Sequence, residues 1–410
     1  MMAARWKTDR GPLVMPLTRE RANVAVLAAS EALFMTGATV LIIVAGLAGF
    51  ALAEDKAFAT LPITAVMIGT VSTTIPASLL MKKIGRRPGF ILGAFIGAIG
   101  AAVAAAGIFV EDFRVFVLGM FVVGVYAGFA QYYRFAAADV AGPDFQSRAI
   151  SLVVAGGVVA ALAGPEMAKW SSELFAPKPF LGSFLVVAGL GLAAAALLLR
   201  LDIPPPREEE IRGSGRPLLR IMRQPAFLVA VLVGMIGYGV TVLMMAVTPL
   251  AMVAYSHGLD HIAFVIQWHT LAMFFPALFT GSLIRRFGVL TIMLGGVALL
   301  GGCSVAALAG VGISQFWLGL AALGLGWNFT FIGASTLLTE TYAPAERAKV
   351  QAANDFLVFG LTATASVLSG ALLDRFDWQA VNYVAVPFLL AAVAAILWLA
   401  MHRRAAYRLS

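Results

Sequence analysis

The chain has 410 residues, of which 61% are hydrophobic and only 12% are charged, with a formal net charge of +8 at pH 7. An ordinary soluble domain is nearer half apolar, so this composition excludes a soluble globular protein. Apolar runs of 20 or more residues recur along the whole sequence. Each run can cross a hydrocarbon core about 30 Å thick, which indicates a polytopic α-helical membrane protein.

The apolar runs, taken in chain order, predict an all-α fold of twelve transmembrane helices. Boundaries between neighbouring runs are marked by charged residues, Pro and Gly. The predicted spans are 23–51, 58–81, 88–110, 113–137, 148–170, 180–200, 226–253, 262–283, 289–311, 315–340, 349–373 and 379–401.

Lys and Arg residues alternate in density between the connections of these spans. With Met1 on the cytoplasmic side, 24 of the 29 Lys and Arg residues fall in cytoplasmic segments. The five on the opposite side are Lys56, Arg114, Lys169, Lys178 and Arg375. The positive-inside rule therefore predicts that both termini are cytoplasmic, and we expect the membrane to be a bacterial inner membrane. The same rule accounts for the basic composition, so no binding to nucleic acid is needed to explain it.

A basic segment recurs half a chain apart. Leu-Met-Lys-Lys-Ile-Gly (80–85) follows the second span, and Leu-Ile-Arg-Arg-Phe-Gly (283–288) follows the eighth. Between the two copies lies the one long polar segment, 201–225, whose Pro run and Gly-Ser-Gly are typical of a linker. The sequence thus predicts two six-helix bundles in pseudo-twofold repeat, residues 1–200 and 226–410, joined by a cytoplasmic linker at 201–225.

These motifs resemble the major facilitator superfamily over the whole length of the chain. That family's loop after the second span reads Gly-x-Leu-Ala-Asp-Arg-x-Gly-Arg-Lys. The positions that fit are Leu80, Lys83 (for Arg), Gly85, Arg86 and Arg87. Ser78 and Lys82 depart from it, at the first Gly and at the acid, and Arg285 again replaces the acid in the second copy. The resemblance implies a secondary active transporter that works by alternating access.

In the family, such loops hold the two halves together while the inner side is closed. Anchoring to anionic lipid, at about 1 kcal/mol per cation, is the alternative reading. Without an acid at position 82, a latch here would use carboxylates elsewhere, Asp139 or Glu340. The residues we assign to gating are Lys82, Lys83, Gly85, Arg86, Arg87, Asp139, Arg148, Gly164, Pro165, Arg285, Arg286, Gly288, Glu340 and Arg347.

Coupling to a proton gradient would need a titratable group inside a span, where a charge costs at least ~2.5–3.5 kcal/mol and so requires a reason. Glu31 in span 1 and Asp355 in span 11 are the carboxylate candidates, and His269 in span 8 is a weaker one. The alternative is structural: a buried partner for Arg134, or a hydrogen bond at a helix end. Gly164-Pro165 partly resembles the signature of the family's proton antiporters, which slightly favours antiport or efflux, although a packing kink explains it equally well.

Spans 1, 4, 7 and 10 line the cavity in this superfamily, and their polar and aromatic residues suggest a small amphipathic or aromatic organic solute. Bundle packing is the alternative for the aromatic residues. The predicted cavity residues, including some in spans 8 and 11, are Met35, Gln131, Tyr133, Arg134, Tyr238, Met245, Gln267, Trp268, Trp327, Asn328, Phe331 and Asn354.

No catalytic motif, phosphate loop or metal-ligand spacing is present in the sequence. We therefore expect no enzymatic activity and no cofactor, with a proton gradient as the driving force. We also expect a monomer that lies in the lipid bilayer and binds a small-molecule substrate. A protein of the same fold that no longer transports, acting as a receptor or assembly factor, is the alternative function, since both motif acids are replaced.

Overall fold

The computed structural model describes residues 17–55, 58, 61–205, 215–375 and 378–409, and its regular structure in these ranges is helical. Side chains are described there except at 17–18, 246, 250, 259–260, 263, 366–375 and 406–409. The helices of the first half are α1 (Leu17–Leu52), α2 (Leu61–Ile84), α3 (Arg86–Phe109), α4 (Phe113–Ala130), α5 (Tyr133–Val140), α6 (Gln146–Val154), α7 (Gly157–Ser172) and α8 (Leu181–Leu198). Those that follow are α10 (Leu218–Met222), α11 (Pro225–Ala254), α12 (Leu259–Phe274), α13 (Ala277–Phe287), α14 (Val289–Ala309), α15 (Ile313–Thr339), α16 (Arg347–Arg375) and α17 (Trp378–Leu409).

The predicted polytopic all-α fold is confirmed. In the described part of the chain, ten helical segments are long and apolar enough to cross a membrane, and the bent pair α12 and α13 makes an eleventh. The remaining predicted span corresponds to α16, whose last turns (366–375) lie outside the described side chains. Three predicted spans are each built from two consecutive helices: α4 with α5, α6 with α7, and α12 with α13.

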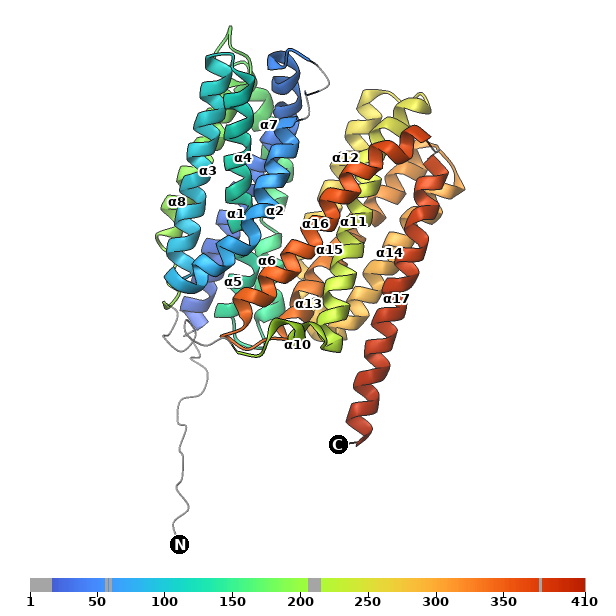
Figure 1. The fold of residues 1–410 in the computed structure, drawn as a ribbon. Coiled ribbons are helices and arrows are strands. Elements are labelled where there is room, and N and C mark those ends of the chain that lie inside the picture. Colours follow the sequence, from blue (N-terminus) through green and yellow to red (C-terminus); the bar gives the residue numbers. More distant parts are fainter. Residues whose placement is uncertain (1–16, 56–57, 59–60, 206–214, 376–377, 410) are drawn as a thin grey trace.

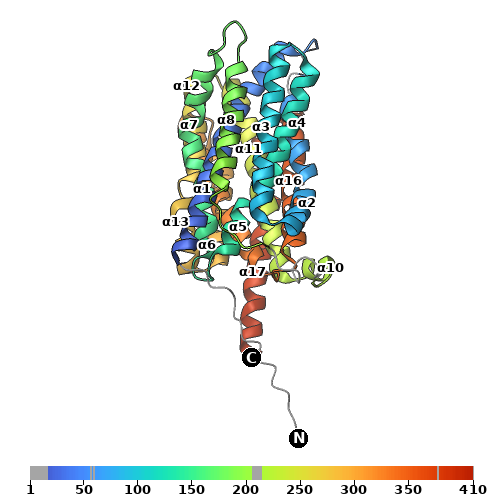
Figure 2. The same cartoon turned by 90° about the vertical axis from the view of Figure 1, so that its left-hand side faces the viewer.

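The helices form two bundles that stand side by side in Figure 1, and in the view of Figure 2 the first bundle lies in front of the second. In the first half, α3 packs on α4 and α8, and α1 packs on α7 and α8. In the second half, α15 packs on α14, α12 and α11. Helix α1 begins and α17 ends at the same end of the molecule, which we call the terminal side, and the opposite end is the distal side. The two bundles converge at the terminal side and diverge toward the distal side (Figure 1).

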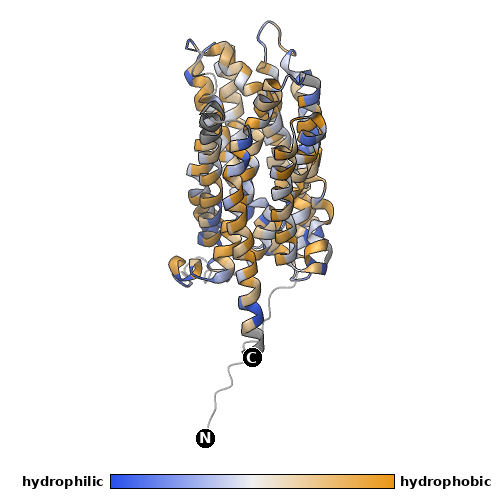
Figure 3. Cartoon of the chain, turned by 90° about the vertical axis from the view of Figure 1, so that its right-hand side faces the viewer, coloured by the Kyte–Doolittle hydropathy of each residue, from blue (hydrophilic) through white to orange (hydrophobic). Residues whose placement is uncertain are grey.

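Large apolar side chains cover the outside of the bundles. Leu118, Trp170, Val305 and Leu390 are all exposed, although a soluble protein would bury such residues. In Figure 3 the hydrophobic colours run along the length of the helices, and the hydrophilic ones are sparse on this face. This surface is suited to lipid, and it leaves the interior of the molecule to hold the polar groups.

Equivalent glycines position corresponding helices in the two halves. A Cβ atom added to Gly124 of α4 would overlap the backbone of Val66 in α2, and one added to Gly324 of α15 would overlap the backbone of His269 in α12. Small residues let helices approach closely in a membrane, where van der Waals packing drives their association. Gly85 and Gly288, at the ends of the repeated basic segments, both adopt positive φ angles of 94° and 85°. The repeat seen in the sequence is therefore also a repeat in backbone conformation.

Candidate functional site

A cavity of about 660 Å³ lies between the two halves. Its lining comes from α1, α4, α6 and α7 on one side and from α11, α12 and α15 on the other, with Arg134 contributed by α5. This size is within the range of pockets that hold small organic molecules.

The wall from the first half carries the charged groups of the lining, set among apolar side chains. Along α1, Glu31, Met35 and Thr39 recur every four residues, so one face of this helix looks into the cavity. Gln131 follows α4, and Glu166 lies on α7 directly after Pro165. The charged lining residues among the described ones, Glu31, Arg134 and Glu166, thus all belong to this wall.

The wall from the second half is aromatic. Trp327 and Phe331, one turn apart on α15, are stacked with ring centroids 4.8 Å apart and planes 13° apart. Tyr238 of α11 meets both edge-on, at 5.5 and 5.6 Å, and Phe274 of α12 meets Trp327 at 5.7 Å. All four line the cavity, together with Met245 and the polar Gln267 and Thr270. Such a cluster offers flat, polarisable surface to a planar ring.

An ion pair joins the two halves at the cavity. Arg134 donates through Nη2 to Oδ1 of Asp355 on α16 at 2.5 Å, and both side chains are almost fully buried. Arg134 also donates through Nη1 to the carbonyl oxygen and to Oε1 of Gln131, at 2.7 and 3.0 Å. Its guanidinium lies 4.5 Å from the ring centroid of Phe135 and 4.7 Å from that of Phe331. The sequence left two roles open for Asp355, proton coupling or a buried partner for Arg134. In the structure its carboxylate is paired with Arg134.

Two carboxylates in the cavity lack such a partner. Among the described residues, neither Glu31 nor Glu166 has a hydrogen bond or an ion pair. The sequence places Lys169 one turn after Glu166, where an ion pair at the outer edge of the span is a natural reading. In the structure, Glu166 lines the cavity instead.

Three helix breaks surround the cavity. The first lies at Gln131–Tyr132, the second at Ala155–Gly156 and the third at Phe275–Pro276. Pro276 has no N–H to continue its helix, and Asn328 of α15 donates to the carbonyl oxygen of Met273 beside this break at 2.6 Å. Irregular backbone at this depth of a membrane is found where it lines a cavity or is buried in protein, so these breaks belong with the site.

On the terminal side of the cavity, α2 and α16 close the gap between the halves. Ser78 donates to the carbonyl oxygen of Ala348 at 2.8 Å. Buried Arg86 bonds Oε1 of Gln351 at 2.5 Å and Oδ2 of Asp139 at 3.0 Å. Arg347 of the second half lies 3.7 Å from the same oxygen of Asp139, so that this carboxylate lies between cations of both halves.

Helices α6 and α13 close the other flank of the terminal side. Ser151 donates to the carbonyl oxygen of Ala277 and accepts from the N–H of Gly281 at 2.9 Å, and Ser147 donates to the carbonyl oxygen of Gly281 at 3.0 Å. A side chain at Gly281 would collide with the backbone of Arg148. The hydrogen bonds and ion pairs between α1–α8 and α11–α17, within the described residues, all lie at the cavity floor or on its terminal side. The terminal side is therefore closed.

Several residues that the sequence assigned to the cavity lie outside its lining. Tyr133 is fully buried against Phe90, and Asn354 donates to Oδ1 of Asp355. Trp268 is exposed and packs on Trp317. Asn328 is buried at the break of span 8, as described above. Each of them is adjacent in sequence to a lining residue or to the Arg134–Asp355 pair, but on a different face of its helix.

His269 also lies away from the cavity. Its side chain is fully buried, and Nδ1 is 2.8 Å from the carbonyl oxygen of Leu320 in α15. This contact ties α12 to α15 within the second half, which is the structural reading of a lone membrane histidine.

The other residues assigned to gating have varied surroundings. Glu340 pairs with Arg403 of α17 at 2.6 Å, within the second half, so of the two candidate latch carboxylates only Asp139 lies between the halves. Arg87 donates to the carbonyl oxygen of Leu199, and Arg286 lies over the ring of Phe287. Lys83, Arg148 and Arg285 are exposed and Lys82 is half-buried. A side chain at Gly164 would overlap Thr39 of α1, and α7 continues through Pro165, so the break in this span lies at Gly156 instead.

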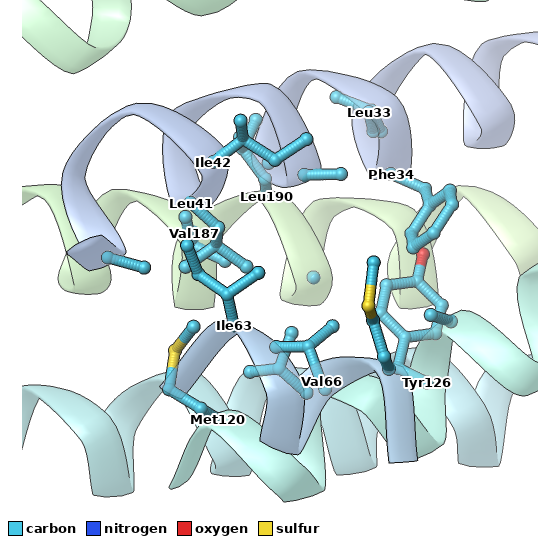
Figure 4. Close-up of a pocket in the computed structure, with 18 residues that line it drawn as sticks. Leu33, Phe34, Leu41, Ile42, Ile63, Val66, Met120, Tyr126, Val187 and Leu190 are labelled. Atoms are coloured by element: carbon cyan, nitrogen blue, oxygen red, sulfur yellow. The ribbon is translucent and has the colours of Figure 1, made fainter. Parts of the chain in front are cut away.

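A second, smaller cavity of about 190 Å³ lies inside the first half (Figure 4). Apolar side chains line it, among them Leu41, Ile63, Met120 and Val187. The hydroxyl of Tyr126 is the polar side-chain group there, and it is 3.3 Å from the hydroxyl of Tyr133. This cavity involves one half alone, so the larger cavity between the halves is the candidate site for a solute.

Sequence reasoning missed part of the lining. Thr39, Glu166, Thr270, Met273 and Phe274 all line the cavity. For Thr39 the four-residue spacing from Glu31 and Met35 was an available signal. Thr270, three residues after the predicted Gln267 on α12, had a similar signal. Glu166 on α7 had none, because Lys169 three residues later favoured an ion pair at the outer edge of the span.

Comparison with known proteins agrees with this geometry. The sequence profile of the Major Facilitator Superfamily matches residues 27–361 and 236–409. The riboflavin transporter RfnT of Brucella anthropi is 42% identical, with 90% of this chain and 94% of that protein covered. The uncharacterised transporter YdeG of Bacillus subtilis is 25% identical, with 83% of each chain covered.

Solved structures share the fold at low sequence identity. The transporter FucP in its outward conformation superposes with a TM-score of 0.74 at 17% identity, over 92% of this chain and 98% of that one. The human organic anion transporter MFSD10 gives a TM-score of 0.76 at 14% identity, over 93% and 100%. The profile match and the relative at 42% identity together decide the assignment. This chain is a membrane transporter that belongs to the Major Facilitator Superfamily.

Proposed function

We propose that this protein transports riboflavin, or a flavin closely related to it, across the cytoplasmic membrane. The observation that carries the proposal is the two-sided cavity, with a stacked aromatic wall facing a wall of hydrogen-bonding groups. Riboflavin has a planar three-ring system and a polyhydroxylated chain, so it presents one surface for each wall. A relative at 42% identity that is named for this substrate supports the same choice.

In this proposal the flavin ring packs against Trp327 and Tyr238, and stacking of that kind contributes roughly 1–3 kcal/mol per ring. The hydroxyl chain and the polar ring edge bond to groups such as Thr39, Gln131 and Gln267, which line the same cavity. The terminal side is cytoplasmic, and the protein works as a monomer, because one chain supplies both walls. The described conformation is then outward-facing.

Glu31 is the group we propose for coupling to protons. It lines the cavity on α1 without an ion-pair partner among the described residues, whereas the carboxylate of Asp355 is held by Arg134. A substrate that binds one protonation state better can shift the balance between inward and outward states by its differential affinity for them.

Transport of radiolabelled riboflavin into proteoliposomes, with and without an imposed pH gradient, tests both parts. We expect saturable transport by the native protein and its loss in Trp327→Ala. In Glu31→Gln we expect exchange of riboflavin down its own gradient to persist while pH-driven accumulation is lost. Glu111→Gln is the matched control, since Glu111 is an exposed loop carboxylate that pairs with Lys178.

The two parts can fail separately. No riboflavin transport by correctly folded native protein would overturn the substrate. Undiminished pH-driven accumulation in Glu31→Gln would overturn the coupling role and turn attention to Asp355.

A further inference from the structure

Acidic residues outnumber basic ones in the lining of the cavity. Glu31 and Glu166 are unpaired there, and Arg134 is the one cation among the described lining residues. We infer that the cavity selects uncharged solutes and that, among flavins, it admits riboflavin and excludes riboflavin 5′-phosphate. This inference rests on the proposed function and adds to it the basis of substrate selection.

Arg134 is not available to receive an anion. Its Nη2 is held by Asp355 and its Nη1 by Gln131, and its guanidinium lies between the rings of Phe135 and Phe331. The one nitrogen without a partner, Nε, is buried and has almost no accessible surface. A phosphate could bind this side chain only by displacing Asp355, which would break the ion pair between the halves.

The two unpaired carboxylates lie toward opposite ends of the cavity. On α1, the lining positions run from Glu31 through Met35 and Thr39 to Ile42, and since α1 begins on the terminal side, Glu31 is nearest to the floor. Glu166 follows Pro165 in the part of α7 that leads away from the break at Gly156. A flavin whose chain ends in a phosphate would therefore bring that group toward Glu166 in one orientation, and in the other toward Glu31, which repels it in its ionised form.

The physical basis is repulsion between like charges, at half-buried Glu31 and at the more exposed Glu166. A phosphate monoester carries a charge between −1.5 and −2 at neutral pH. Unpaired like charge is how a binding site rejects a competitor that matches the preferred solute in shape, and its cost is large where water is displaced. Riboflavin and its 5′-phosphate share the ring and the chain and differ in this charge, so they form a matched pair of probes.

Binding measured by quenching of flavin fluorescence on the purified protein tests the inference. We expect native protein to bind riboflavin at least ~10-fold more tightly than riboflavin 5′-phosphate, since like-charge contacts weaken binding of the charged ligand. Glu166→Gln should narrow this ratio, and the double variant Glu31→Gln with Glu166→Gln should narrow it further, through tighter binding of the phosphate. Glu111→Gln removes one negative charge outside the cavity and should leave the ratio unchanged.

Each outcome decides a separate point. Equal binding of the two flavins by native protein, or an unchanged ratio in Glu166→Gln and in a double variant that keeps its melting temperature, overturns the charge selection alone. Failure of folded native protein to bind riboflavin overturns the proposed function and the selection among flavins with it.

Discussion

The two walls of the cavity differ in the kind of contact that they offer. The charged residues that line it, Glu31, Arg134 and Glu166, lie on the first half, and the aromatic ones, Tyr238, Phe274, Trp327 and Phe331, lie on the second. A solute that contacts only one wall would bind one half and leave the other free to move. An amphipathic solute contacts both, so its binding is tied to the relative position of the halves, which alternating access requires.

The largest effect is expected where the walls meet. Asp355→Asn removes the partner of Arg134 and leaves a buried cation, a change that typically costs 3–5 kcal/mol. We expect the melting temperature to fall and transport to be lost. The control is Glu340→Gln, which removes an exposed carboxylate paired with Arg403 within one half. This variant should change the melting temperature and the transport rate only slightly.

A compensating pair of substitutions separates stability from function at this position. Arg134→Met with Asp355→Leu replaces the ion pair by apolar groups, which is often neutral for stability. The double variant should recover its melting temperature but not transport. If transport recovers as well, the pair has no role beyond holding the fold.

The next largest effect concerns the aromatic wall. Trp327→Ala removes the face on which the ring is proposed to stack, at roughly 1–3 kcal/mol, or about 5- to 150-fold in Kd. Trp327→Phe keeps an aromatic face and should lose much less affinity for riboflavin. Titration of flavin fluorescence measures both, and equal affinity of Trp327→Ala and native protein would show that the second half does not hold the ring.

A smaller effect is expected on the polar wall. Thr39→Val keeps the methyl group that packs against Gly164 and replaces the hydroxyl, which donates within α1 to the carbonyl oxygen of Met35, by a second methyl group. Loss of one hydrogen bond costs about 0.5–1.5 kcal/mol, or roughly 2- to 12-fold in Kd. The loss should vanish for a flavin analogue without the hydroxylated chain, and persistence with that analogue would place the chain elsewhere.

The smallest effect on affinity is expected at a carboxylate outside both walls. Buried Glu346 accepts two hydrogen bonds from the side chain of Arg216 in the linker, at 2.6 and 2.8 Å, and one from its backbone N–H at 2.7 Å. This pairing lowers the pKa of Glu346 from 4.5 to about 2. A lowered folded-state pKa contributes stability above the unfolded pKa, and that stability is lost as pH falls through the folded one. Glu346→Gln should therefore lower the melting temperature near neutral pH, with a difference that shrinks as pH falls from about 4.5 toward 2. Its Kd for riboflavin should be unchanged.

Much of this fold could be predicted from the sequence because membrane spans are long and apolar and their flanks are basic. Two of the three helix breaks could not, since Gln131–Tyr132 carries no helix-breaking residue and the glycine pair at 156–157 serves equally well for close packing, whereas Pro276 marks the third in the sequence. At Gly157 the close neighbour is Phe274 of the other half, a contact that depends on how the bundles pair.

The cavity was predictable only in part, for a related reason. A span that is apolar on all sides does not reveal which face meets lipid, a neighbouring helix or the cavity. Trp327 lines the cavity, whereas its neighbour Asn328 is turned toward the break in span 8.

The three helix breaks have a mechanical consequence. Helices α5, α6 and α13 are the short pieces on the terminal side of these breaks, and α6 and α13 carry the contacts that close one flank of that side. Each of these short helices can rotate about the break that joins it to the rest of its span, and each break lies beside the cavity. Small backbone rotations at these breaks would let the short helices move while the long helices keep their packing, and so would add to any opening of the terminal side that movement of the two bundles produces.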